Sequence, residues 1–95
     1  MTINTAITNG ILCIGAWKEG YSYKMYPYVS VKSGSASVTR LSTISNGYRN
    51  STRGGMSCYR ITASSGAILR LWATGTENSS SADTGGCAFV VMLTN

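Results

Sequence analysis

Apolar and polar side chains alternate along much of this chain with a period of two residues. In residues 67–74 one side of the chain carries Ala67, Leu69, Leu71 and Ala73. The other side of that stretch carries Ile68, Arg70, Trp72 and Thr74. Residues 56–63 repeat the pattern, with Tyr59, Ile61 and Ala63 opposite Cys58, Arg60 and Thr62. A period of two predicts extended strands that turn one face toward a core.

Seven stretches have the alternation or the composition of strands. They are residues 11–17, 21–23, 26–32, 36–44, 56–63, 67–74 and 87–93. Turns are expected at 33–35, at Asn46-Gly47 and at 64–66, and exposed loops at 48–55 and 75–86. Pro27 cannot donate to a strand ladder, so it marks a strand start or a sheet edge.

These elements predict an all-β fold: a small jelly roll or β-sandwich of about six to eight antiparallel strands, without significant helix. Residues 1–8 are expected as an extended N-terminal arm that lies on a neighbouring molecule, and residues 9–95 as a single β domain. The length of 95 residues allows only one domain. A hydrophobic share of 43% against 12% charged residues excludes a disordered chain.

We expect neither a signal peptide nor a membrane span. The first five residues, Met1 to Thr5, contain no basic leader and no apolar block. The apolar runs are a handful of residues long, far short of the roughly 20 that a spanning helix needs.

Residue types that carry out catalysis are scarce in this chain. It has no histidine and only three acidic residues, Glu19, Glu77 and Asp83. Without histidine there is no imidazole base or zinc ligand, and no Ser-His or Cys-His pair. Glu77 and Asp83 lie in one serine-rich loop, which lacks the enclosed setting of a catalytic carboxylate pair. We therefore expect no enzyme activity, no catalytic or metal site and no cofactor.

Basic residues outnumber acidic ones, which gives a net charge of +5. The eight basic residues are spread singly along the chain rather than gathered in a run. A clustered stripe would favour nucleic acid. Scattered cations do not favour a nucleic-acid partner, but they indicate a general affinity for anionic surfaces.

The three cysteines, Cys13, Cys58 and Cys87, are odd in number and far apart in the sequence. Such spacing fits neither a disulfide framework nor a metal site. All three lie in apolar alternating runs, which favours buried free thiols in a reducing cytosol. One disulfide with a spare thiol is the alternative.

Two of the expected strands carry apolar side chains on both faces. The last strand has Ala88, Val90 and Met92 on one side, and Cys87, Phe89 and Val91 on the other. In the strand before it, Ile68 and Trp72 flank Arg70 on the nominal outer face. A small sheet protein cannot cover both faces of such strands alone, so we expect an oligomer. The predicted oligomer interface consists of Ile68, Arg70, Trp72, Ala88, Val90 and Met92. A closed barrel wrapped by loops is the alternative.

The C-terminal part of the chain, residues 59–75 and 88–93, consists of a strand, a tight Ser-Ser-Gly turn, a second strand and a terminal apolar strand. This order resembles the C-terminal half of short jelly-roll heads related to the tumour-necrosis-factor and C1q folds. Such heads occur on bacteriophage fibre tips, tail needles and capsid decoration proteins. The resemblance implies a homotrimer with the terminal strand near the three-fold axis.

Several exposed residue types are candidates for ligand or partner contact. Four tyrosines lie close together in the sequence: Tyr21, Tyr23, Tyr26 and Tyr28. Their rings suit stacking on sugars or bases, and cross-strand pairing in a sheet is the alternative. Arg49, Asn50 and Arg53 form a candidate contact loop or a solvated turn. Trp72 with Arg70 suits an interface hot spot or packing within the oligomer. The sequons at Asn50 and Asn78 are expected by chance in a Ser/Thr-rich chain.

Together these features predict a non-enzymatic virion structural protein, a homotrimeric capsid decoration or cement protein on a bacteriophage. Its expected partners are itself, the major capsid protein or another virion protein, and in addition a host surface glycan. Its expected location is the virion, assembled in the host cytoplasm. A receptor-binding fibre tip and a carbohydrate-binding module are the alternatives. A barrel that binds single-stranded nucleic acid is a third, weaker candidate.

Overall fold

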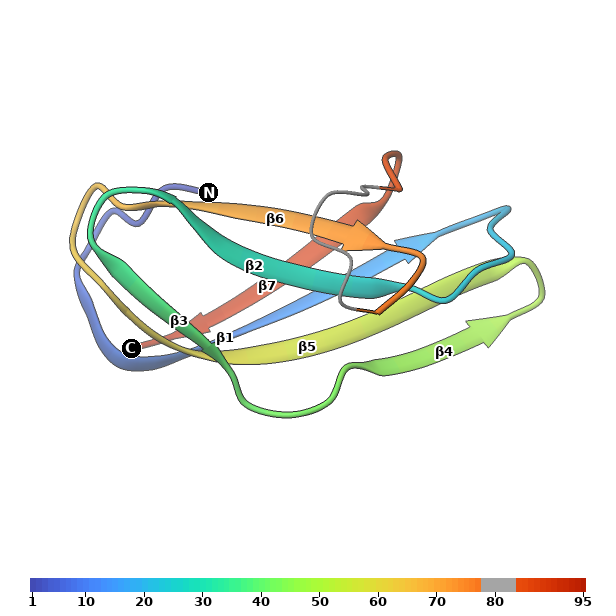
Figure 1. Cartoon of the computed structure of the whole chain (residues 1–95), viewed down its shortest axis with the longest axis horizontal. Helices are drawn as coiled ribbons and strands as arrows, with labels where there is room; N and C mark the ends of the chain where they lie inside the picture. Colours follow the sequence, from blue (N-terminus) through green and yellow to red (C-terminus); the bar gives the residue numbers. More distant parts are fainter. Residues whose placement is uncertain (78–83) are drawn as a thin grey trace.

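The chain folds into two antiparallel β-sheets packed face to face (Figure 1). The computed structural model describes residues 1–77 and 84–95. Within these residues the strands are β1 (Ile7–Lys18), β2 (Tyr26–Ser33), β3 (Ala36–Arg40), β4 (Ser45–Arg49), β5 (Thr52–Ala63), β6 (Ile68–Thr74) and β7 (Ala88–Thr94). The described residues contain no helix, and so none that is long and apolar enough to cross a membrane. The predicted all-β sandwich of antiparallel strands is confirmed.

The larger sheet has the strand order β3-β5-β1-β7, and β4 also pairs with β5. The 12 residues of β5 give room for β3 along its second half and for β4 along its first half. β1 lies between β5 and β7 and pairs with both. A strand with a neighbour on each side is the most enclosed part of a sheet, which suits the apolar sequence of β1.

The smaller sheet consists of β2 and β6, and the N-terminal residues extend it. The backbone N–H of Ile3 donates to the carbonyl oxygen of Ala67 at 2.8 Å, and that of Leu69 donates to the carbonyl oxygen of Met1 at 2.8 Å. Ile3 is only 2% exposed. The segment 1–8 was expected as an arm on a neighbouring molecule. In the structure residues 1–3 lie along β6 of their own chain, residues 7 and 8 already belong to β1, and the core buries Ile3 and Ile7.

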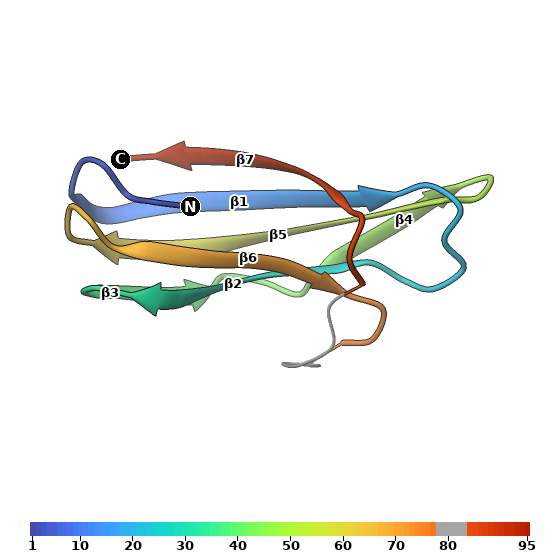
Figure 2. The same ribbon diagram turned by 90° about the horizontal axis from the view of Figure 1, so that it is seen from above.

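The core consists of side chains from both sheets, whose strands Figure 2 shows from above. Its buried residues are Ile3, Ile7, Leu12, Ile14, Val29, Tyr59, Ile61, Ala63, Ala67 and Leu69. The alternation predicted for β5 is confirmed, since Tyr59 and Ile61 are buried whereas Arg60 between them is exposed. Cross-strand partners share a face, so the register of β1 with β5 and β7 fixes which side of each strand meets the core.

A buried polar network ties the two sheets together at Pro27. The hydroxyls of Ser57 and Tyr59 lie 2.8 and 3.2 Å from the Pro27 carbonyl oxygen, and 3.0 Å from each other. Pro27 is the second residue of β2, which is an edge strand, as its missing donor requires. The buried hydroxyls of Ser57 and Tyr59 therefore both have hydrogen-bond partners, which offset the cost of removing them from water.

The buried Tyr59 hydroxyl makes the protein sensitive to alkaline pH. Burial raises the pKa of Tyr59 above its ordinary value of 10.0, and the hydrogen bond with Ser57 partly opposes that rise. Above pH 10 the unfolded phenol loses its proton while the folded one keeps it, so the free energy of unfolding falls as pH rises. We expect Tyr59→Phe to lose about 1 kcal/mol at pH 7 and to flatten this alkaline decline. Urea unfolding between pH 8 and 11 measures both effects, and an unchanged decline in the variant would contradict the assignment.

Residues 45–63 form a β-hairpin, where the sequence pattern indicated a turn and an exposed loop. The expected turn at Asn46-Gly47 lies inside β4, and the chain reverses instead at Asn50-Ser51. Asn50 has a φ of 55°, a left-handed conformation that asparagine tolerates better than most residues. Every side chain of β4 is exposed, so its polar sequence gave no alternation to recognise. Two further expectations were wrong: residues 21–23 are not a strand, and β3 ends at Arg40 rather than at residue 44.

Cys13 and Cys58 form a disulfide, and Cys87 is free. The favoured interpretation of three free thiols was therefore wrong, and the alternative of one disulfide with a spare thiol is confirmed. The two cysteines are directly opposed in the register of β1 with β5, with their Cα atoms 4.1 Å apart. They are 45 residues apart in the sequence, so their spacing could not reveal the pair.

Residues 78–83 lie outside the described part of the chain. The expected loop at 75–86 lies partly within this gap. The sequon at Asn78 and the Glu77–Asp83 carboxylate pair also depend on residues within it.

Candidate functional site

The two halves of the predicted oligomer interface lie on opposite faces of the sandwich. Ala88, Val90 and Met92 are opposite odd-numbered residues of β1, which point away from the core. Ile68, Arg70 and Trp72 alternate with core residues of β6, so they turn outward from the smaller sheet. The structure does not bring the two sets together, because β6 and β7 belong to different sheets. A single flat interface cannot include both.

The β7 half lies within a larger apolar surface on the outer side of the larger sheet. We name this surface the β7 face and define it by Trp17, Met56, Ala88, Val90 and Met92. Four of these side chains are exposed large hydrophobics: Trp17 at 45%, Met56 at 54%, Val90 at 52% and Met92 at 66%. They belong to three neighbouring strands, β5, β1 and β7, and form adjacent cross-strand rows.

The register explains how the β7 face is assembled. Val90 is opposite Gly15, and Gly15 is opposite Met56, so these three form one row across the sheet. A Cβ on Gly15 would lie 3.1 Å from Cγ1 of Val90, so the glycine gives the valine room to lie across β1. Met92 is opposite Cys13, next to the disulfide. The β7 face is thus a patch built on a covalently crosslinked pair of strands.

β7 is also exposed on its inner side and along one edge. It ends the order of the larger sheet, so one edge has no strand partner among the described residues (Figure 2). On its inner side Phe89 is 39% and Leu93 42% exposed, because the smaller sheet does not extend over β7. An open groove of about 480 Å³ lies here between the N-terminal segment and the residues Val91, Leu93, Thr94 and Asn95. The sequence indicated that β7 has apolar side chains on both faces, and in the structure both faces are exposed.

The β6 half of the predicted interface is largely occupied by its own chain. The ring of Trp72 stacks on Tyr28 with 5.5 Å between centroids, and the Arg70 guanidinium lies 4.3 Å from the Trp72 ring centroid. Trp72 is 7% exposed, and its Nε1 is buried without a hydrogen-bond partner. Little of the indole is left for another molecule to contact.

The four tyrosines do not form one platform, and Tyr28 has the cross-strand partner, Trp72, that the alternative interpretation expected. Tyr26 and Tyr28 lie on β2 in the smaller sheet and are half-buried. Tyr21 and Tyr23 lie between β1 and β2, with their rings in edge contact at 5.6 Å. Tyr23 is 67% exposed. Although all four tyrosines are close in the sequence, only Tyr21 and Tyr23 lie together in the segment between β1 and β2.

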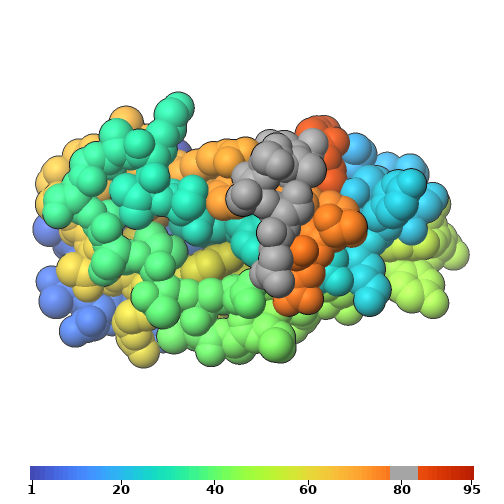
Figure 3. All heavy atoms as spheres, viewed as in Figure 1, coloured from blue at the N-terminus to red at the C-terminus, as the bar shows by residue number. Residues whose placement is uncertain are grey.

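A second surface forms at that end, where the segment 19–25 lies on the β4–β5 hairpin (Figure 3). The Tyr21 N–H donates to the Ser51 carbonyl oxygen at 3.0 Å. The Met25 N–H donates to Oδ1 of Asn46 at 2.8 Å. A groove of about 350 Å³ runs between this segment and the hairpin. Its lining residues are Ser22, Tyr23, Lys24, Asn46, Gly47, Tyr48 and Arg53. We name this surface the tyrosine end and define it by Tyr23, Lys24, Tyr48 and Arg53.

The sequence interpretation identified Tyr23 and Arg53 but missed Tyr48, which is 77% exposed. Tyr48 and Arg53 are directly opposed across the hairpin, and the Arg53 guanidinium lies 4.7 Å from the Tyr48 ring centroid. A two-residue turn at Asn50-Ser51 would have predicted this pair, had β4 been recognised. Arg49, a candidate of the same predicted loop, alternates with Tyr48 and therefore lies on the other face of the hairpin.

Hydrogen bonds and ring contacts hold the side chains around this groove. Arg53 donates from Nη1 to the Asn50 carbonyl oxygen at 2.9 Å. Lys18 donates from Nζ to the Thr84 carbonyl oxygen at 3.1 Å, and its Nζ lies 5.1 Å from the Tyr21 ring centroid. Burial raises the pKa of Tyr21, and repulsion from the Cys87 and Tyr23 groups adds to that rise. Tyr21 is therefore a neutral phenol at neutral pH and adds no negative charge to this end of the molecule.

No group of three or more histidine, cysteine, aspartate or glutamate side chains suited to a metal ion occurs among residues 1–77 and 84–95. A comparison with protein-family models, with curated proteins and with solved structures finds no match to this chain.

Proposed function

We propose that this protein is a non-enzymatic structural protein that works as an oligomer, joined through the β7 face. The single observation that carries the proposal is the exposure of β7: apolar side chains on both of its faces, next to Trp17 and Met56. Contiguous exposed apolar patches are typical of surfaces that another protein covers. The edge of β7 that has no strand partner among residues 1–77 and 84–95 adds a second means of association.

A homotrimer on the surface of a virion, as a capsid decoration protein, is the form of this function that we propose. The resemblance to trimeric jelly-roll heads supports a three-fold arrangement with the terminal strand near the axis. The exposed apolar strand is the one at the C-terminal end of the described chain, which is the strand that the resemblance places there. A decoration protein stabilises the particle because it binds only the assembled state.

The disulfide also supports a location on the outside of a particle. Disulfides persist in oxidising surroundings and are rare in a reducing cytosol. A virion released from its host meets oxidising conditions, so the Cys13–Cys58 bond suits a mature particle better than an intracellular complex.

The solution mass of the isolated protein tests this proposal directly. We expect light scattering in non-reducing buffer, over a concentration series, to approach three times the chain mass of 10.1 kDa. Addition of the trimer to purified particles, followed by sedimentation, then measures decoration. A monomer at every concentration would overturn the assembly proposal.

A further inference from the structure

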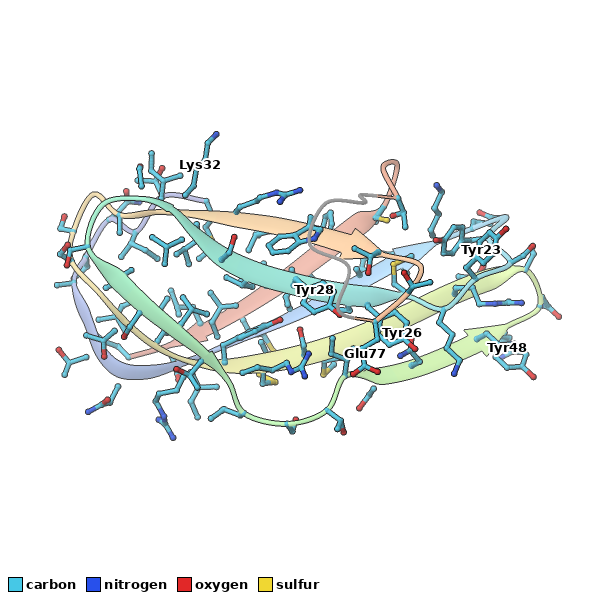
Figure 4. All side chains as sticks on the ribbon, viewed as in Figure 1. Tyr23, Tyr26, Tyr28, Lys32, Tyr48 and Glu77 are labelled. Atoms are coloured by element: carbon cyan, nitrogen blue, oxygen red, sulfur yellow. A yellow bond between two sulfur atoms is a disulfide. The ribbon has the colours of Figure 1, made fainter. Side chains whose placement is uncertain are left out.

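We propose that the tyrosine end binds an acidic saccharide, a sugar carrying a carboxylate, in the groove between Tyr23 and Tyr48. This inference concerns the end of the molecule formed by residues 19–25 and the β4–β5 hairpin, and it does not depend on the β7 face. Figure 4 shows Tyr23 and Tyr48 at this end, with Tyr28 nearer the middle of the molecule.

The first argument is the exposure of two aromatic rings on opposite sides of one groove. Tyr23 is 67% and Tyr48 77% exposed. Backbone hydrogen bonds nevertheless hold both segments in place, from Tyr21 to Ser51 in one and between β4 and β5 in the other. Isolated exposed apolar groups are ordinary, but two rings lining one groove offer flat surfaces on which the C–H face of a sugar can stack. Their hydroxyls remain available to hydrogen-bond sugar hydroxyls.

The second argument is a fixed guanidinium beside one of these rings. Arg53 is held at 4.7 Å from the Tyr48 ring centroid and donates to the Asn50 carbonyl oxygen, so its rotamer is set before a ligand arrives. Only Nη1 is used in this hydrogen bond, which leaves further N–H groups free to bind a carboxylate with two parallel bonds. A preorganised side chain loses less entropy when it binds.

The third argument is an excess of positive charge at this end. Lys24 and Arg53 both line the groove. Glu19 is the one acidic residue of the segment 19–25, and it does not line the groove. These two cations would attract an anion in the groove, and they would not attract a neutral sugar.

The shape of the site favours a short saccharide over a nucleic acid. A groove of about 350 Å³ is at the small end of ligand pockets and suits one or two sugar rings. A nucleic-acid strand needs a line of cations that follows several phosphates. Other cations do not continue the groove: Arg49 lies on the other face of the hairpin, Arg60 on the outer side of β5 and Arg70 on β6.

The test is a titration of the 95-residue chain with trigalacturonic acid, and separately with the matched neutral trisaccharide galactotriose. NMR spectra monitor both titrations. We expect the acidic sugar to shift the Tyr23 and Tyr48 ring signals, with a Kd of about 10 µM to 1 mM. The neutral sugar should bind at least tenfold more weakly. Because the ring signals are read in the wild-type protein, the result does not depend on how any variant folds.

Two variants and a matched control assign the binding to the groove. Tyr48→Ala and Arg53→Gln should each weaken trigalacturonic acid binding at least tenfold. Arg60→Gln is the control, because Arg60 lies on the same strand and also donates from Nη1 to a backbone carbonyl, that of Asn9 at 3.0 Å. Equal binding of both sugars, tighter binding of an oligothymidylate, or equal weakening by Arg60→Gln would overturn the proposal.

Discussion

Removal of the Cys13–Cys58 disulfide is expected to lower the free energy of unfolding by about 4 kcal/mol. The bond closes a loop of 45 residues, and a crosslink of that length removes conformational entropy from the unfolded chain. For a domain of 95 residues this is a large share of the 5–15 kcal/mol or so that holds typical domains together. Cys13→Ala combined with Cys58→Ala should therefore leave the isolated chain close to unfolding at 37 °C.

Urea unfolding of the wild-type protein and of the double variant measures this difference. The matched control is Cys87→Ser, which removes the free thiol and keeps the disulfide. Addition of a reductant should lower the stability of the wild-type protein and of Cys87→Ser, and leave the double variant unchanged. If the double variant unfolds at the same urea concentration as the wild-type protein, the crosslink has no role in stability.

The location of the disulfide links stability to the proposed assembly surface. Cys13 is directly opposed to Met92 on one side and to Cys58 on the other. The crosslink therefore joins the two strands that carry Trp17 and Met56, and β7 pairs with one of them. A rigid sheet loses less conformational freedom when another subunit covers it, so the same bond that stabilises the monomer also prepares the β7 face.

Local alternation was enough to predict the strands that have one buried face and one exposed face. In β6 and in residues 56–63 of β5 the pattern gave both the strand and its inward side, because these stretches lie over the core. Residues 52–55 of β5 were expected as part of a loop. The pattern failed for β4, whose side chains are all exposed and therefore show no contrast. The hairpin is held by backbone pairing with β5 and by the turn at Asn50, neither of which requires apolar residues.

The sequence could indicate which residues face outward, but not which sheet they face outward from. Val90 and Trp72 both alternate with inward residues, yet they lie on opposite sides of the molecule because β7 pairs with β1 and β6 pairs with β2. Strand pairing at long range sets this, and one sequence carries no direct record of it. The same limit explains why Tyr48 and Tyr23, 25 positions apart in the chain, were not recognised as neighbours.

A lysine at Met92 is expected to abolish oligomerisation while the monomer stays folded. Met92 is 66% exposed, so the substitution should disturb the isolated chain little. Burying the methionine in an interface would contribute about 2 kcal/mol per subunit, which the lysine would forfeit. Around a three-fold axis the three ammonium groups would also repel each other. At a separation of about 8 Å and an effective dielectric constant of about 20, this repulsion is about 2 kcal/mol per pair. The concentration at which oligomers form should therefore rise by at least a hundredfold.

Light scattering over a concentration series, with circular dichroism to confirm the fold, compares Met92→Lys with Ser37→Lys. Ser37 is exposed on the same outer side of the larger sheet but on β3, at the opposite edge from β7, so this control adds the same charge away from the β7 face. Ser37→Lys should keep the wild-type mass, and Met92→Lys should give a monomer. If Met92→Lys retains the oligomer, its side chain lies outside the interface and association must use the free edge or the inner side of β7. If both lysines dissociate the oligomer, net charge rather than the β7 face controls assembly.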